Sequence, residues 1–226
     1  MRKVYLNHDG GVDDLVSLYL LLKMEDVELV GVGVIEADCY LEPAVEASKK
    51  IIQKFGSTND QKIRVASSNS RPVHPFPKEW RMHAFTVDAL PILNEYKPIL
   101  VQDSPYKAHE DLVHVLKEST EKVDLLFVGP LTDLARALDL DSSIEEKIGK
   151  LYWMGGTFLD QGNIEEPEHD GTAEWNVYWD PFAAKRVWES SIPIELVALE
   201  STRMVPLTLD VRDRWARERK VEGIDF

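Results

Sequence analysis

Short runs of apolar, often β-branched residues alternate along this chain with segments of helical character. The longest run, Val27–Ile35, is nearly continuous in apolar side chains, which is typical of a strand covered on both faces in a parallel sheet. We expect strands at Val4–Leu6, Val27–Ile35, Ile63–Ala66, Val123–Val128, Leu151–Met154 and Ile194–Leu199, and helices at Val12–Met24, Glu42–Phe55, Ala108–Glu118, Leu131–Leu138, Asp180–Glu189 and Arg212–Lys220. The alternation predicts an α/β fold with an open, mostly parallel, Rossmann-like sheet flanked by helices.

Length and charge narrow the function classes. The 226 residues suit a single domain over 1–226. A net charge of −14 argues against a nucleic-acid partner, because phosphate binding needs a basic face. The single cysteine, Cys39, excludes an intrachain disulfide, and we expect it to be a buried small hydrophobe. With no apolar run long enough to span a membrane and no signal peptide, we expect no membrane association and a cytoplasmic location.

An acidic cluster follows the first predicted strand, in the segment Asn7-His8-Asp9-Gly10-Gly11-Val12-Asp13-Asp14. In open α/β sheets, ligands bind beyond the carboxyl ends of the strands. Helix capping explains one or two of the aspartates, whereas a hard cation with oxygen ligands would relieve the repulsion among all three. An EF-hand is excluded, because its twelfth position, counted from Asp9, is Leu20. At this point a metal site and capping with solvation both remain open.

Several motifs, in order, resemble those of the nucleoside hydrolase family of the inosine-uridine-preferring type. The family opens with Asp-x-Asp-x-x-x-Asp-Asp, where this chain has Asn7 in place of the first Asp. The segment 129–135, Gly-Pro-Leu-Thr-Asp-Leu-Ala, is similar to the family's Gly-Pro-Leu-Thr-Asn-Leu-Ala. Met154-Gly155-Gly156, Gly162-Asn163 and the Glu-Trp-Asn…Asp-Pro block at 174–181 resemble the family's later motifs. The resemblance extends from Lys3 to about Thr208 and implies the nucleoside hydrolase fold.

This resemblance implies calcium-dependent hydrolysis of the N-glycosidic bond of ribonucleosides to ribose and free base. Asp9 resembles the family's Ca²⁺ ligand and general base, Asp14 resembles a second ligand, and Val128 stands where the family supplies a backbone carbonyl. The implied substrate-binding residues are Asp13, Asp38, His83, Met154, Asn163, Glu174 and Asn176. Two of these, Glu174 and Asn176, would share one face if their segment were extended. An acidic pocket would also stabilise the positively charged sugar of the transition state.

Some of these residues have structural interpretations. Asn163 beside Gly162 suits an ordinary turn, Met154 suits the core, and His83 suits the surface. For His8 we favour a surface or satisfied histidine. For Trp175 and Trp179 we favour packing over stacking on a base.

The chain departs from the family near its C-terminus. It has Glu200 where the family usually has Asp, and nothing after Thr202 resembles the family's late His-Asp pair. We therefore expect a C-terminal part to be missing.

Three other functions remain as alternatives: a non-catalytic calcium- or nucleoside-binding module, a ribohydrolase acting on another substituted ribose, and an interaction protein with an acidic surface. The family also predicts a homodimer or homotetramer. Base preference is left open, because the loop Lys78–Asp88, with Trp80, Met82 and Phe85, is variable in the family.

Overall fold

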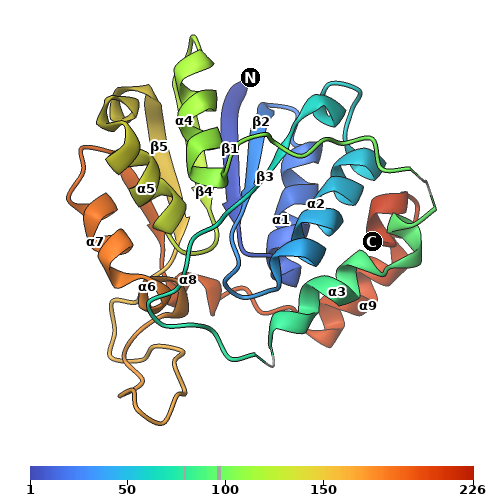
Figure 1. The fold of residues 1–226 in the computed structure, drawn as a ribbon. Helices are drawn as coiled ribbons and strands as arrows, with labels where there is room; N and C mark the ends of the chain where they lie inside the picture. Colours follow the sequence, from blue (N-terminus) through green and yellow to red (C-terminus); the bar gives the residue numbers. More distant parts are fainter. Residues whose placement is uncertain (79, 96–97) are drawn as a thin grey trace.

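A parallel sheet of six strands forms the centre of the computed structural model, which describes residues 1–78, 80–95 and 98–226 (Figure 1). The strand order is β3-β2-β1-β4-β5-β6, so the chain starts in the middle of the sheet and builds outward in both directions. The strands are β1 (Arg2–His8), β2 (Val27–Val34), β3 (Val65–Ser67), β4 (Val123–Phe127), β5 (Ile148–Met154) and β6 (Ile194–Val197). The predicted α/β class and parallel sheet are confirmed.

The helices cover both faces of this sheet. They are α1 (Val12–Lys23), α2 (Leu41–Phe55), α3 (His83–Asp88), α4 (Ala108–Glu118), α5 (Thr132–Leu140), α6 (Trp175–Trp179), α7 (Pro181–Trp188), α8 (Leu199–Thr202) and α9 (Leu209–Arg217). Successive residues of β1 serve opposite faces: Leu6 packs in a cluster with Leu15 of α1, and Tyr5 in another with Leu112 of α4. This two-sided burial explains why consecutive residues in the middle of these strands, such as Val4, Tyr5 and Leu6, are apolar.

Several predicted boundaries move once strands are paired. β1 extends from Arg2 to His8 because each of its residues finds a partner on β2, from Val27 to Val34. The last strand, β6, ends at Val197, and Leu199 already starts α8. The C-terminal helix starts earlier than expected, at Leu209, where the Thr208 hydroxyl accepts a hydrogen bond from the Val211 amide (3.3 Å).

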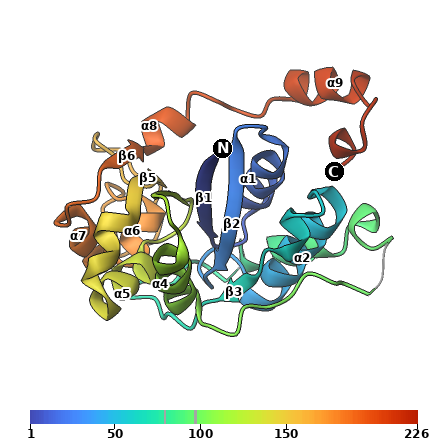
Figure 2. The same cartoon turned by 90° about the horizontal axis from the view of Figure 1, so that it is seen from above.

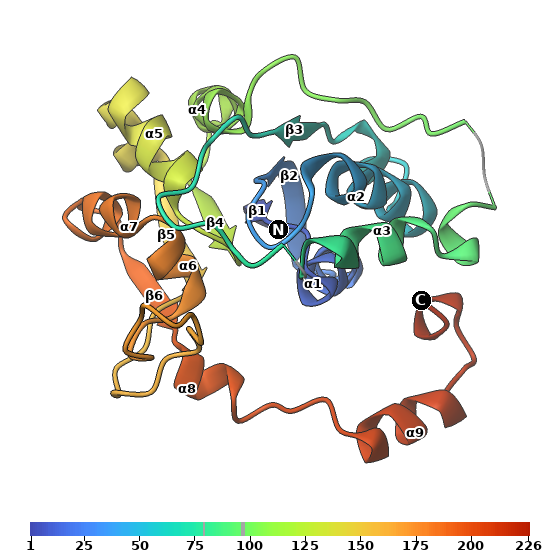
Figure 3. The same cartoon turned by 60° about the horizontal axis from the view of Figure 1, so that its bottom comes forward.

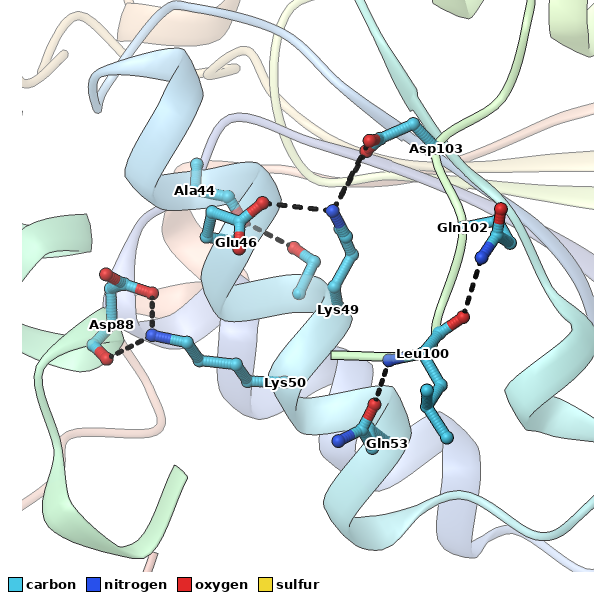
Figure 4. A network of polar contacts seen from close by, with 10 residues as sticks. Ala44, Glu46, Lys49, Lys50, Gln53, Asp88, Leu100, Gln102 and Asp103 are labelled. Atoms are coloured by element: carbon cyan, nitrogen blue, oxygen red, sulfur yellow. Dashed lines mark hydrogen bonds and ion pairs between the residues drawn. The ribbon is translucent and has the colours of Figure 1, made fainter. Parts of the chain in front are cut away.

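The segment 69–104, for which we expected little regular structure, contains α3 and two short 3-10 turns. Polar side chains of α2 contact the later part of this segment, between Asp88 and Asp103 (Figure 4). Lys50 contacts the Asp88 carboxylate (2.7 Å) at the end of α3, and Lys49 contacts Asp103 (3.2 Å). The side-chain oxygen of Gln53 accepts a hydrogen bond from the backbone amide of Leu100. Helix α2 therefore fixes the irregular segment beside the sheet.

The last residues run away from the sheet. After α8 the chain crosses to α9 along the outside of the molecule and returns with its end near α1 and α2 (Figures 2 and 3). Within the described residues, no helix has the length and apolar character needed to cross a membrane.

Candidate active site

The turn between β1 and α1 places the acidic cluster at the carboxyl edge of the sheet. Gly10 has a φ of +89°, and a Cβ there would stand 2.5 Å from that of Ala44, so only glycine allows the chain to turn so close to α2. The last residue of β1, His8, is buried; its Nδ1 accepts from the Gly10 amide (3.2 Å) and its Nε2 lies 3.1 Å from the Ser48 hydroxyl. His8 is thus a satisfied core histidine, as favoured.

Asp9 and Asp14 are both buried and held by backbone amides. One carboxylate oxygen of Asp14 accepts from the amides of Asp9 (3.2 Å) and Gly11 (3.1 Å). One oxygen of Asp9 accepts from the amide of Asp38 (3.1 Å), in the turn after β2. Asp14 therefore caps α1, as expected for one of the aspartates. Capping does not explain Asp9.

Asp13 and Asp38 border the same space. A Cβ on Gly11 would lie 2.8 Å from an Asp13 oxygen, 3.1 Å from an Asp38 oxygen and 3.5 Å from an Asp14 oxygen. Asp13 is exposed and Asp38 half-buried. His83, the exposed first residue of α3, lies close enough for its charge to lower the pKa of Asp38. The structure therefore gathers Asp9, Asp13, Asp14 and Asp38 from two loops, with His83 at their rim.

The electrostatics of this cluster follow from burial. Burial raises the pKa of Asp9 to about 7, and the charge of Asp38 adds to that rise. Burial and the Asp9 charge raise the pKa of Asp14 well above its ordinary value. Burial also raises the pKa of Asp38, while His83 opposes it. Buried carboxylates that repel one another are a costly arrangement for the fold and are typical of functional sites.

A second group of polar residues lies at the ends of β4 and β5. The Asn176 side-chain amide donates to the backbone carbonyls of Val128 (3.2 Å) and Met154 (3.1 Å), and it lies 3.4 Å from the Met154 sulfur. The Asn163 side-chain oxygen accepts from the Trp175 amide (3.0 Å). Asn176 thus links the carbonyl of Val128 to Met154, while Asn163 is bound to the start of α6, the helix that carries Asn176.

Glu174 caps α6, which corrects one expectation. Its carboxylate accepts from the amides of Asn176 (2.9 Å), Gly156 (2.8 Å) and Val177 (3.2 Å). The backbone of Glu174 is extended, but Asn176 is already helical, so the shared-face argument from an extended segment is wrong. The cap requires this bend, because the first amides of a helix need an acceptor. Trp175 and Trp179 are buried, which confirms the packing interpretation.

The two groups meet at the end of β4. A Cβ on Gly129 would lie 3.3 Å from an Asp9 oxygen, and the carbonyl of the preceding Val128 belongs to the second group. Two buried carboxylates, Asp9 and Asp14, and a backbone carbonyl are the hard oxygen donors that Ca²⁺ prefers. Among the described residues, no three acidic, histidine or cysteine side chains are arranged to hold an ion by themselves. The donor set fits calcium only if carbonyl, water or substrate oxygens complete it.

The loop Lys78–Asp88, which the resemblance places near the nucleobase, has exposed apolar side chains. Met82 and Phe85 are exposed, and Phe85 packs edge-on against Tyr40 with ring centroids 5.9 Å apart. Glu79 of the Lys78–Asp88 loop and the Trp80 side chain lie outside what the structure describes.

A buried polar network beneath the carboxylates was not identified from the sequence. Asp133, at the start of α5, accepts from Asn7 on β1 and from the hydroxyls of Ser68 and Ser70 after β3. The sequence did contain a signal for this network. Asn7 stands where the opening motif of the family has Asp, and Asp133 stands where the 129–135 motif has Asn.

Comparison with known proteins agrees with the geometry. Residues 4–224 match the sequence profile described as inosine-uridine preferring nucleoside hydrolase. A solved structure from Bacillus anthracis, described in the same words, is 62% identical with a TM-score of 0.96, covering 100% of this chain and 74% of the other. A probable uridine nucleosidase 2 of Oryza sativa is 28% identical over 92% of this chain. A pyrimidine-specific ribonucleoside hydrolase, RihB, of Escherichia coli strain SE11 is 26% identical over 96%. The chain spans 59% of the rice protein and 65% of the bacterial one.

Proposed function

The chain belongs to the inosine-uridine preferring nucleoside hydrolase family, and from this premise we propose that it hydrolyses the N-glycosidic bond of ribonucleosides with the help of Ca²⁺. The observation that carries the proposal is the burial of Asp9 beside Asp14, at the carboxyl end of the central strand and against the end of β4. The names of the similar proteins support a ribonucleoside substrate.

Asp9 is suited to remove a proton from the attacking water. Burial raises its pKa to about 7 in the calcium-free protein, and a bound cation would lower this pKa, so that Asp9 is deprotonated and able to accept a proton near neutral pH. The Asp38 amide donates to the Asp9 carboxylate and fixes its direction, and the Asp9 backbone amide donates to the Asp14 carboxylate. Asp9 therefore acts as the base in this proposal, and an adjacent water is its partner.

Calcium would be held by Asp9, Asp14 and the Val128 carbonyl, and when bound it would lower the pKa of a water ligand and contact sugar hydroxyls. Around it, Asp13, Asp38 and Asn163 offer oxygen acceptors to ribose, while Glu174 keeps the second group rigid through its three backbone hydrogen bonds. The negative potential of these carboxylates would stabilise the oxocarbenium-like sugar.

A ribose-release assay tests the proposal. The purified protein would be incubated with inosine, uridine, adenosine and cytidine, first with added Ca²⁺ and then with a chelator. We expect ribose release that the chelator abolishes. We also expect Asp9→Ala to lower kcat by at least about a thousandfold, since both the base and a metal ligand are lost.

Asp26→Ala is the matched control, because Asp26 is exposed in the turn between α1 and β2, at the opposite edge of the sheet from the acidic cluster. It should leave activity unchanged. A folded protein that binds Ca²⁺ but releases no ribose would contradict the hydrolase and favour a binding module. Release only from a different ribosyl compound would favour the other ribohydrolase. The cytoplasmic location and the dimer or tetramer stay predictions.

A further inference from the structure

Asn7 and Asp133 form a hydrogen bond in the fully buried layer beneath the acidic cluster. Both residues have 0% exposure. The Asn7 amide donates to one oxygen of Asp133 (3.2 Å), and the hydroxyls of Ser68 (2.7 Å) and Ser70 (2.9 Å) donate to the other. Burial raises the pKa of Asp133 and these three hydrogen bonds oppose the rise. The three groups that donate to this carboxylate are neutral, and the charge of His109 also lowers its pKa.

The pair joins β1 to the start of α5, beside β2. Asn7 is on β1, two residues before Asp9, and its carbonyl accepts from the Val128 amide (3.1 Å). Asp133 is in the first turn of α5, shortly after Gly129. Gly33 of β2, the register partner of Asn7, leaves space for the amide, since a Cβ there would lie 2.6 Å from the Asn7 nitrogen. The hydrogen bond thus ties the end of β1 to the segment that follows β4.

These two residues are also the two at which the opening motif and the 129–135 segment differ from the family pattern. In the motifs that these segments resemble, the first position is a carboxylate and the second an amide, whereas this chain has Asn7 and Asp133. The two differences are therefore the two ends of one hydrogen bond.

We propose that Asn7 and Asp133 are a positioning pair for Asp9, in which amide and carboxylate have exchanged places, and that either order supports the site while two carboxylates do not. The proposal rests on the proposed function, since it concerns the placement of the base. Asn7→Asp would set two carboxylates about 3 Å apart in a buried layer that offers only neutral donors. Asp133→Asn alone keeps the acceptor for both serine hydroxyls and should be milder.

The test is a cycle of Asn7→Asp, Asp133→Asn and the double exchange. We expect Asn7→Asp to lower kcat by at least about tenfold with KM changed less than about threefold, because geometry at the base is disturbed more than ribose binding. The double exchange should recover most of that loss. Hydrogen–deuterium exchange of residues 7–14 and 127–130 should follow the same order, with faster exchange in Asn7→Asp and recovery in the double variant.

Asp111→Asn is the matched control. Asp111 is also a buried carboxylate, held by the Tyr5 hydroxyl (3.0 Å) and the Ser104 hydroxyl (2.5 Å), but it does not bond to Asn7. This variant should lower the free energy of unfolding. It should leave the hydrogen–deuterium exchange of residues 7–14, kcat and KM unchanged.

The proposal would be overturned if Asn7→Asp left kcat and hydrogen–deuterium exchange unchanged. It would also be overturned if the double variant recovered none of the kcat that Asn7→Asp loses. If the wild type releases no ribose, the proposed function fails, and the exchange measurements still decide whether the pair orders the Asp9 turn.

Discussion

The centre of the sheet and the C-terminal arm, residues 203–226, use similar side chains with opposite results. In β1, the five residues Val4–His8 are all buried. In the arm, Met204, Val205, Leu207 and Leu209 are 69–81% exposed, and α9 buries no residue. The arm is attached mainly at its end, where Phe226 packs against Tyr19 and Phe55 with ring centroids 5.8 and 5.3 Å apart.

The difference shows that apolar content does not by itself produce a core. β1 is flanked by a strand on each side and by helices on both faces, so each side chain meets a partner. Helix α9 has apolar residues of the same kind, but no surface formed by the described residues buries them. The candidate site draws its rigidity from the first region, and the arm should open at low free energy.

Two tryptophans, one buried in α6 and one exposed in the arm, test whether burial and not residue type decides the contribution to stability. Trp179 is 1% exposed at the end of α6, and its carbonyl accepts from the amides of Val73 and His74. We expect Trp179→Ala to lower the free energy of unfolding by about 3–5 kcal/mol, because a large side chain leaves a cavity. Urea denaturation followed by far-UV circular dichroism measures it.

Trp215→Ala in α9 is the matched variant. Trp215 is 54% exposed, so we expect a change within about 0.5 kcal/mol in the 226-residue protein. A loss comparable to that of Trp179→Ala would contradict the contrast and would mean that α9 packs on a surface formed in solution.

The glycine turn of the site should be the next most sensitive position. Gly10→Ala combines a left-handed backbone with a Cβ 2.5 Å from Ala44, and we expect a loss of about 2–4 kcal/mol together with lower activity. Gly171→Ala separates the two causes, because Gly171 has φ +81° with its nearest new contact at 3.8 Å. It should cost only about 1 kcal/mol. Equal effects in the two variants would show that the close approach to α2 does not matter.

The pH dependence of stability gives a smaller effect, measured in calcium-free buffer. The folded state holds the Asp9 proton up to about pH 7, against an ordinary pKa of 3.8. The stability from Asp9 is therefore full below about pH 4 and lost as pH rises toward 7. His8 acts oppositely, since its folded pKa of about 4 lies below the ordinary 6.5, so its contribution is lost as pH falls.

Comparing the wild type with Asp9→Asn at each pH cancels the His8 contribution. We expect the free energy of unfolding of the wild type, relative to that of Asp9→Asn, to fall by about 1–2 kcal/mol between pH 4 and 7. Asp14 shares this titration with Asp9. A difference that does not vary with pH would show that Asp9 ionises freely in the fold, and it would remove the physical basis for its role as base.

Local sequence signals predicted most of the elements but few of their contacts. Helix α4 was predicted at both ends, Ala108 and Glu118, because its pattern and its termination are local. β1 was predicted too short, because its outer residues are polar and join the strand only through pairing with β2 and β4. Within the site, the spacing of Asp9, Asp13 and Asp14 was informative because one tight turn carries all three. Glu174 was assigned to the site, but its capping geometry was not predicted.

The sequence by itself determined the α/β class, the strand-end location of the acidic turn and the family, since each depends on short-range pattern or motif order. Only the tertiary structure decided that Asp38 lies against Asp9, that Asn176 contacts Val128, and that Asn7 meets Asp133. These contacts join residues from 29 to 126 positions apart. Parallel strands bring such residues to one edge only after the crossover helices have packed, and no local propensity encodes which side chains then meet.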